Sequence, residues 1–336
     1  MLGSPHGEAE MNLRSIPNPR YCAAALALKG FSGSSVTRRL YRYLSNRVSA
    51  KRHSRVSARH IASGTRLWEL VALYSPPSKG VSRYLEIGTG WTCFYGLLFR
   101  LNFDGHLTLF DVQDCRQMDA LKTRFGTVAD LLPMGLPDRF AGEAEGYRRR
   151  ASAIAGTSSF AELCQRMDLE YVVEPGGLTG VFPDNAFDVV FSWNVLEHVP
   201  RRQFFALPQE ILRILAPGGI TVHRIDFTDH LTTQYAPTAS LKEYLRYSES
   251  AWKACFDNQL QHMNRLQASQ VSSAFTESGF ELVHDDREVS ADLAESVVLS
   301  PLWGRIREDD LVCTGATMVF RKPVVASNVP GTNRVA

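Results

Sequence analysis

The stretch that decides the fold is Arg83-Tyr84-Leu85-Glu86-Ile87-Gly88-Thr89-Gly90-Trp91-Thr92. Its first five residues have the length and apolar content of a β-strand, and the two glycines allow a sharp backbone turn. A helix is expected next, at 94–101, and a second apolar strand, at 107–110, is followed by Asp111. A strand, a glycine turn, a helix and a strand in this order indicate a parallel βαβ unit.

The alternation of strands and helices continues toward the C-terminus. Further strands are expected at 171–173, 188–192, 220–225, 280–284 and 311–320. Such a series is typical of an α/β fold with a doubly wound, mostly parallel sheet. The segment 130–168 is too long for a simple crossover, so we expect an insertion over the sheet.

The composition is that of a globular protein. Of the 336 residues, 44% are hydrophobic and 21% are charged, which excludes a disordered or fibrous chain. The apolar run at 22–28 is much shorter than the roughly 20 residues of a membrane-spanning helix. Glu8 and Glu10 stand where a secretory signal needs basic residues. The six cysteines form no CxxC pair, so a reducing, cytoplasmic location is expected.

Charge sets the N-terminal part of the chain apart. Residues 1–80 carry 13 basic and 3 acidic side chains, whereas the rest of the chain carries 24 and 32. We expect a flexible tail at 1–20, a basic helical extension at 21–78, a main domain at 79–325 and a second tail at 326–336. Within the extension, helices are expected around 36–48 and from Ser63 or Thr65 to Tyr74.

The basic extension has several possible roles. Its arginines and tyrosines could bind nucleic acid or an anionic membrane surface. Leu40 and Leu44 instead favour a face packed on the acidic body, and a lid over a ligand-binding site is a further option. We expect no nucleic-acid partner and no membrane span, and self-association into a homo-oligomer is left open.

The glycine turn and the following acid indicate a nucleoside-containing cofactor. Gly88 and Gly90 let a ligand approach backbone N–H groups, and Asp111 is placed to accept hydrogen bonds from a ribose diol. A dinucleotide fingerprint needs a third glycine where this chain has Cys93. Glu86 would repel a pyrophosphate and suits a positively charged group. These residues favour S-adenosylmethionine over a nicotinamide dinucleotide.

Several motifs, taken in order, resemble those of class I S-adenosylmethionine-dependent methyltransferases. They are residues 85–90, Asp111, and residues 182–192, 195–199 and 215–219. The resemblance covers about 80–230 well and 275–322 loosely. It is closest to small-molecule methyltransferases, and the Glu-Ile-Gly-Thr-Gly-Trp and His-x-Ile-Asp-x-x-Asp-His stretches are similar to enzymes of sugar and polysaccharide pathways. One departure is Thr92, where many members have a third glycine.

The resemblance implies a Rossmann-like fold and S-adenosylmethionine as the cofactor. It places Glu86, Gly88, Gly90 and Trp91 around the methionine part, Asp111 on the ribose, Val112 on the adenine, and Trp193 and Asn194 beneath the transferable methyl group. For Trp193, a place in the apolar core is an equal alternative.

Candidate proton acceptors should follow the strands at 188–192 and 220–225. His198 follows the first of these, and Asp226 and His230 follow the second, where the carboxylate could orient the imidazole. His223 lies within a strand and is expected to be a buried histidine. Two alternatives remain for the loop: a divalent metal held by Asp226 and Asp229, or a polar turn that caps the next helix. No metal ligand is assigned.

The sequence thus predicts methyl transfer from S-adenosylmethionine to an oxygen of a small polar metabolite, such as a sugar or a natural-product scaffold. Transfer to nitrogen is one alternative. Another is a protein that binds S-adenosylmethionine without turnover and acts through regulation or a partner. Cys93 and Glu86 disfavour a nicotinamide-dependent reductase.

Overall fold

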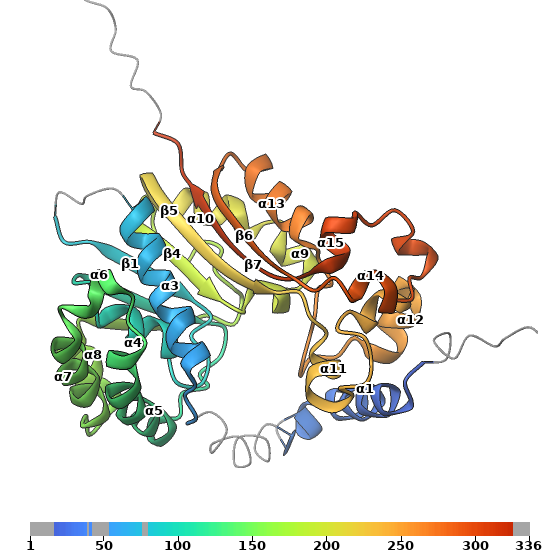
Figure 1. The fold of residues 1–336 in the computed structure, drawn as a ribbon, viewed down its shortest axis with the longest axis horizontal. Coiled ribbons are helices and arrows are strands. Elements are labelled where there is room, and N and C mark those ends of the chain that lie inside the picture. The colour runs from blue at the N-terminus through green and yellow to red at the C-terminus, as the bar shows by residue number, and fades with distance from the viewer. Residues whose placement is uncertain (1–16, 39, 42–53, 76–79, 325–336) are drawn as a thin grey trace, which may run out of the picture. The chain divides into compact units, whose positions relative to one another are not determined.

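The computed structural model describes residues 17–38, 40–41, 54–75 and 80–324. Seven strands form one sheet in the order β3-β2-β1-β4-β5-β7-β6 (Figure 1). The strands are β1 (Arg83–Ile87), β2 (His106–Asp111), β3 (Leu169–Val173), β4 (Phe187–Trp193), β5 (Leu215–Asp226), β6 (Glu281–Val289) and β7 (Cys313–Arg321). The pairs β1–β2, β2–β3, β1–β4 and β4–β5 are parallel. The predicted doubly wound, mostly parallel sheet is confirmed.

Helices and short helical turns connect the strands. Those of the first half are α1 (Pro19–Ser32), α3 (Ala58–Tyr74), α4 (Phe94–Arg100), α5 (Met118–Leu131), η2 (Leu132–Met134), α6 (Asp138–Ala141), α7 (Ala144–Ala155) and α8 (Phe160–Met167). Those of the second half are η3 (Leu196–His198), α9 (Arg201–Phe204), α10 (Leu207–Ile214), α11 (His230–Tyr235), η4 (Glu243–Arg246), α12 (Glu249–Ala251), the π-helical turn η5 (Trp252–Phe256), α13 (Ala268–Glu277), α14 (Leu293–Ser296), η6 (Pro301–Trp303) and α15 (Glu308–Val312). Within the described ranges, no helix has the length and hydropathy needed to cross a membrane.

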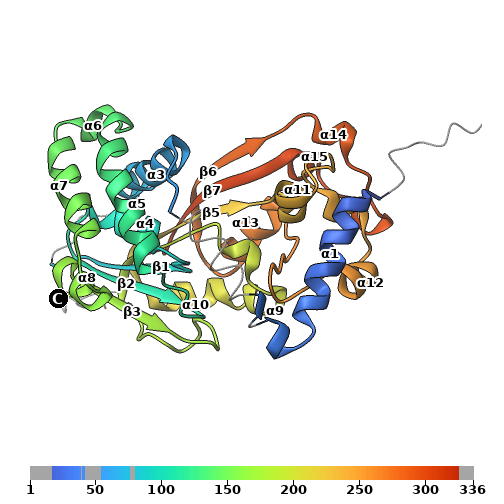
Figure 2. The same cartoon turned by 90° about the horizontal axis from the view of Figure 1, so that it is seen from below.

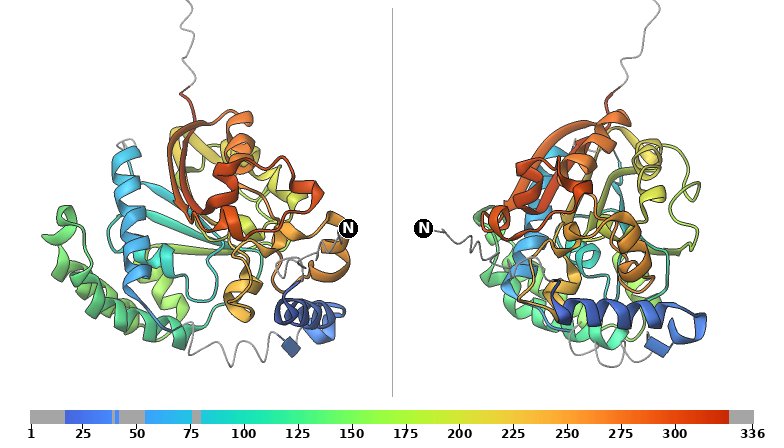
Figure 3. Two further views of the ribbon diagram at one scale, coloured as in Figure 1. Left: turned by 45° about the vertical axis from the view of Figure 1, so that its right-hand side comes forward. Right: turned by 90° about the vertical axis from the view of Figure 1, so that its right-hand side faces the viewer.

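The chain divides into two compact units. The sheet unit comprises residues 44–225, 269–286 and 317–336, and the small unit comprises 1–43, 226–268 and 287–316. Helices α1 and α3, both within the predicted extension, therefore belong to different units. Figure 3 shows α1, in dark blue, as one straight helix.

The sheet unit brings the carboxyl ends of three strands together. Ile87, the last residue of β1, pairs with Phe110 of β2 on one side and with Ser192 of β4 on the other. The chain thus continues from β1 to β2 in one direction and later returns to β4 in the other, which makes this edge a topological switch point. Helices α4 and α5 lie on one face of the sheet and α10 on the other (Figures 1 and 2). Because both faces are covered, most residues of β1, β2, β4 and β5 are buried, whereas β6, at the edge of the sheet, is largely exposed.

The small unit has its own aromatic core. Tyr21, on α1, stacks on Tyr247 with the ring centroids 5.9 Å apart and packs against Phe256. The guanidinium of Arg265 is buried over the Trp252 ring, at 4.8 Å, and donates a hydrogen bond to the Tyr247 carbonyl at 3.0 Å. A buried charge is tolerated here because its donors are satisfied.

Several predicted boundaries shift. The helix expected from Ser63 or Thr65 begins at Ala58, because the Ser57 N–H donates to His60 Nδ1 at 3.1 Å and forms an N-terminal cap. A helix was expected around 36–48. Residues 35–38 and 40–41 are helical, and the rest of this segment lies outside the described residues. The last strand begins at Cys313, since Leu311 belongs to α15.

Candidate functional site

A cavity of about 700 Å³ lies at the carboxyl ends of β1, β2 and β4 in the sheet unit. This volume is within the usual range of small-molecule sites. The lining residues come from four segments: Ile87, Gly88, Gly90 and Trp91; Phe110, Asp111 and Val112; Gly176, Gly177, Leu178 and Thr179; and Asn194, Val195, His198, Val199, Pro200, Arg202, Gln203, Ala206 and Leu207.

The glycine turn forms one wall of the cavity. Gly88 has φ +77°, and a Cβ there would lie 2.5 Å from Val195 Cγ2, so only glycine fits against the segment that follows β4. Gly90 has φ +61° with open space around the position of a Cβ. The turn is held by the Gly88 N–H, which donates to the Phe110 carbonyl at 2.8 Å. The positive φ angles favour glycine at both positions, and the open space at Gly90 lets a ligand approach the backbone.

Asp111 ends β2 and lines the same cavity. Its Oδ2 accepts the Gly90 N–H at 3.0 Å and its Oδ1 accepts the Gln113 N–H at 3.1 Å. Burial raises the pKa of Asp111, although these two N–H groups oppose that change. A carboxylate has about four acceptor sites. The backbone N–H groups do not use all of these sites, so acceptor capacity remains for a ribose hydroxyl, and the residues present fit a nucleoside cofactor.

Glu86 does not line the cavity, contrary to the sequence expectation. Its side chain is 2% exposed, and Oε1 accepts the Gly96 N–H at 3.0 Å. A Cβ on Gly96 would lie 2.3 Å from Oε2, so the glycine makes room for the carboxyl group. Burial, with a smaller contribution from Asp111, raises the pKa of Glu86 to about 8. The carboxyl group joins β1 to α4 behind the glycine turn.

The two residues at the end of β4 point in different directions. Asn194 adopts φ +55° and lines the cavity, and its N–H donates to the Arg224 carbonyl at 2.8 Å. The Trp193 ring is buried and packs on Tyr95, with the centroids 5.1 Å apart. Trp193 is not among the residues that line the cavity. It belongs to the apolar core, which was the alternative position expected for it.

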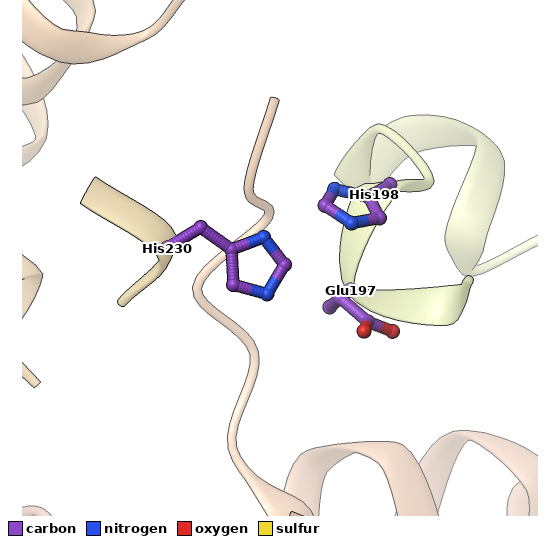
Figure 4. Close-up of side chains that lie close together, drawn as sticks. All are labelled: Glu197, His198 and His230. Carbon is purple, nitrogen blue, oxygen red and sulfur yellow. The ribbon is translucent and has the colours of Figure 1, made fainter. Parts of the chain in front are cut away.

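His198 lines the cavity from the short turn η3. Its N–H donates to the Val195 carbonyl at 2.9 Å, which fixes the turn after β4. Figure 4 shows the His198 and Glu197 side chains extending from this turn. Figure 4 also draws His230, which begins α11 in the small unit.

Asp226 and His230 form a pair within the small unit. The distance from His230 Nε2 to Asp226 Oδ2 is 3.5 Å, and Thr228 donates to Oδ1 through its N–H at 2.8 Å and its hydroxyl at 2.6 Å. Burial acts to raise the pKa of Asp226, but the hydrogen bonds from His230 and Thr228 outweigh it, and the net pKa is lowered. The carboxylate is thus available to orient the imidazole.

Asp229 and His223 are buried and hydrogen-bonded to other parts of the fold. Asp229 is fully buried, caps α11 by accepting the Leu231 N–H at 2.9 Å, and accepts the Tyr21 hydroxyl at 2.7 Å. Both carboxylate oxygens of Asp229, which the sequence offered as a metal ligand beside Asp226, therefore already accept hydrogen bonds. His223 is fully buried within hydrogen-bonding distance of Ser192 Oγ and Thr221 Oγ1, and burial lowers its pKa to about 3. The expectation of a buried histidine is confirmed.

The sequence did not identify several of the individual lining residues. Residues 176–179 begin within a recognisable Pro-Gly-Gly turn, but only the structure places them in the lining of the cavity. The next residue, Gly180, donates its N–H to Glu210 Oε1 at 2.9 Å. Arg202 and Gln203 lie on α9, which is too short for hydrophobic periodicity to show which face it exposes.

One of the comparisons with known proteins matches a family model. The model of a family described as a methyltransferase domain matches residues 57–285. No match was found among the curated proteins.

Solved structures with a similar fold are distant in sequence. The [4+2]-cyclase SpnF is 17% identical, over 78% of this chain and 81% of that one, with a TM-score of 0.42. Phosphoethanolamine N-methyltransferase 2 of Haemonchus contortus, in complex with S-adenosyl-L-methionine, is 14% identical, over 76% and 53%, with a TM-score of 0.41. An S-adenosylmethionine-dependent methyltransferase from Mesorhizobium loti is 15% identical, over 76% and 97%, with a TM-score of 0.40.

Proposed function

Because the chain belongs to the family of methyltransferase domains, with S-adenosylmethionine as the cofactor, we propose that it methylates an oxygen of a small polar metabolite, such as a sugar or a natural-product scaffold. One observation carries the proposal: a carboxylate suited to a ribose, Asp111, and a histidine suited to accept a proton, His198, line the same cavity. A cofactor and an acceptor hydroxyl could therefore meet there.

We assign the cofactor to the part of the cavity formed by the glycine turn and the end of β2. Asp111 would accept the ribose hydroxyls, Val112 would pack on the adenine, and Gly88 and Gly90 would admit the methionine part against the backbone. Trp91 and Asn194 complete this proposed contact set. The bound cofactor supplies an electrophilic methyl group.

His198 is our first candidate for the group that accepts the acceptor's proton. A hydroxyl is a poor nucleophile while protonated, and imidazole is the side chain best suited to take a proton near neutral pH. The rest of the rate gain comes from alignment of the reacting atoms. The Asp226–His230 pair is the second candidate, because a carboxylate at 3.5 Å can hold the imidazole in one tautomer.

The first experiment is a calorimetric titration with S-adenosylhomocysteine, followed by a transfer assay with methyl-labelled cofactor and a small-molecule extract. Binding and a labelled product with an O-methyl group are expected. A labelled amine would move the proposal to N-methylation, and binding without any labelled product would favour the non-catalytic alternative.

A histidine substitution tests the proton acceptor. His198→Ala should lower the transfer rate at saturating acceptor by about 10²- to 10⁴-fold, the usual contribution of a general base. The matched control is His106→Ala, which removes a histidine paired with Asp168 at the start of β2. Equal rates for the two variants would rule out His198 as the base.

A further inference from the structure

The wall of the cavity that follows β4 is rich in hydrogen-bond donors. It consists of η3 and α9, which contribute His198, Arg202 and Gln203 to the lining. Helix α9 buries Phe204 completely and leaves Arg202 and Gln203 exposed. The N–H groups of Gln203 and Phe204 both donate to the Pro200 carbonyl at 2.8 Å. This backbone arrangement fixes the face on which the two polar side chains stand.

Among the described residues, the cavity lining contains one carboxylate and one guanidinium, those of Asp111 and Arg202, and they differ in their hydrogen-bond partners. Asp111 is the acidic residue of the lining, and both its oxygens already accept backbone N–H groups. Arg202 is the lining residue with a permanent positive charge, and within the described residues its guanidinium has no carboxylate partner.

Some other arginines of the same unit are paired with carboxylates. Arg116 binds Asp114 through two hydrogen bonds, and Arg213 binds Glu210 at 2.6 Å. Arg202, by contrast, belongs to the lining of the cavity. A guanidinium offers five N–H donors in a planar fork, which matches the two oxygens of a carboxylate or phosphate.

We propose that the methyl acceptor carries an anionic group, a carboxylate or a phosphate, which Arg202 binds at the cavity wall. This inference rests on the proposed function and narrows its substrate class. Gln203 would add neutral donors beside the guanidinium. Binding at Arg202 would leave the rest of a small acceptor within the cavity that His198 also lines.

Inorganic phosphate is the first probe, added to the full-length protein saturated with S-adenosylhomocysteine. The wild-type protein should bind it with a dissociation constant on the order of millimolar. Arg202→Gln should weaken this binding by about 10- to 100-fold, the range expected for charge-assisted hydrogen bonds. Arg201→Gln is the matched control, because Arg201 lies on the same helix but is not in the lining. Absence of phosphate binding, or equal losses in both variants, would overturn the proposal.

A second measurement separates the acceptor from the cofactor, which has a carboxylate of its own. The affinity for S-adenosylhomocysteine should be the same in Arg202→Gln and the wild type. A parallel loss of cofactor affinity would assign the guanidinium to the cofactor and refute the inference.

The labelled products of the extract assay give an independent readout. They should be retained on an anion exchanger, and Arg202→Gln should reduce them while Arg201→Gln does not. Labelled product in the neutral fraction would refute an anionic acceptor. Absence of any labelled product would instead count against the proposed function, while the phosphate measurement still tests the guanidinium site.

Discussion

The buried carboxyl group of Glu86 should make the protein less stable as the pH rises. The folded protein raises the pKa of this group to about 8, from an ordinary value of 4.5, mainly because burial disfavours the charged form. Between these two values the folded state holds a proton that the unfolded state has lost. The contribution to stability is fully present below pH 4.5 and is lost as the pH rises through about 8.

The size of the effect follows from the difference between the two pKa values. Each pH unit between them lowers the free energy of unfolding by about 1.4 kcal/mol. From pH 5 to pH 7.5 the loss attributable to Glu86 is therefore about 3 kcal/mol. Glu86→Gln has nearly the same shape, can still accept the Gly96 N–H, and has no proton to lose.

The assay is urea unfolding of the wild type and Glu86→Gln at several pH values from 5 to 7.5. The two proteins should be similar at pH 5, and the variant should become more stable than the wild type by about 3 kcal/mol at pH 7.5. Glu281→Gln, which removes an exposed carboxylate from β6, should follow the wild type. If Glu86→Gln also follows the wild type at every pH, the carboxyl group is not held neutral by burial and the reasoning is wrong.

Two further predictions concern the glycine turn and the residue that ends β2. Asp111→Asn should weaken the binding of S-adenosylhomocysteine by about 10-fold or more, because it removes a charged acceptor. Asp114 lies outside the lining, so Asp114→Asn should leave the affinity unchanged in the same titration. Cys93 adopts φ +45°, so Cys93→Gly should be more stable than Cys93→Ala by about 1 kcal/mol in urea unfolding, the reverse of their order inside a helix. A more stable alanine variant would show that the left-handed backbone at Cys93 is not a source of strain.

The sequence alone determined the glycine turn and the strand end that form one side of the cavity. The apolar run of β1, the glycines at 88 and 90 and the acid after β2 are local signals, because strand length, φ preference and strand-end position depend on neighbouring residues. The same holds for the order of strands and helices, which restricts the fold to a wound parallel sheet. The sequence pattern therefore locates the end of β1 at Ile87 and Asp111 at the end of β2, as the structure has them.

Only the tertiary structure decided where several side chains point. Glu86 turns away from the cavity because Gly96 leaves room for its carboxyl group, and Trp193 turns inward because Tyr95 covers it. Asp229 is engaged by Tyr21, a residue 208 positions earlier in the chain. Arg202 and the buried Phe204 lie on the same short helix, and only the structure places Arg202 in the lining of the cavity. Such directions depend on packing between distant segments, whereas the backbone preferences that a sequence pattern reports are set within a few residues.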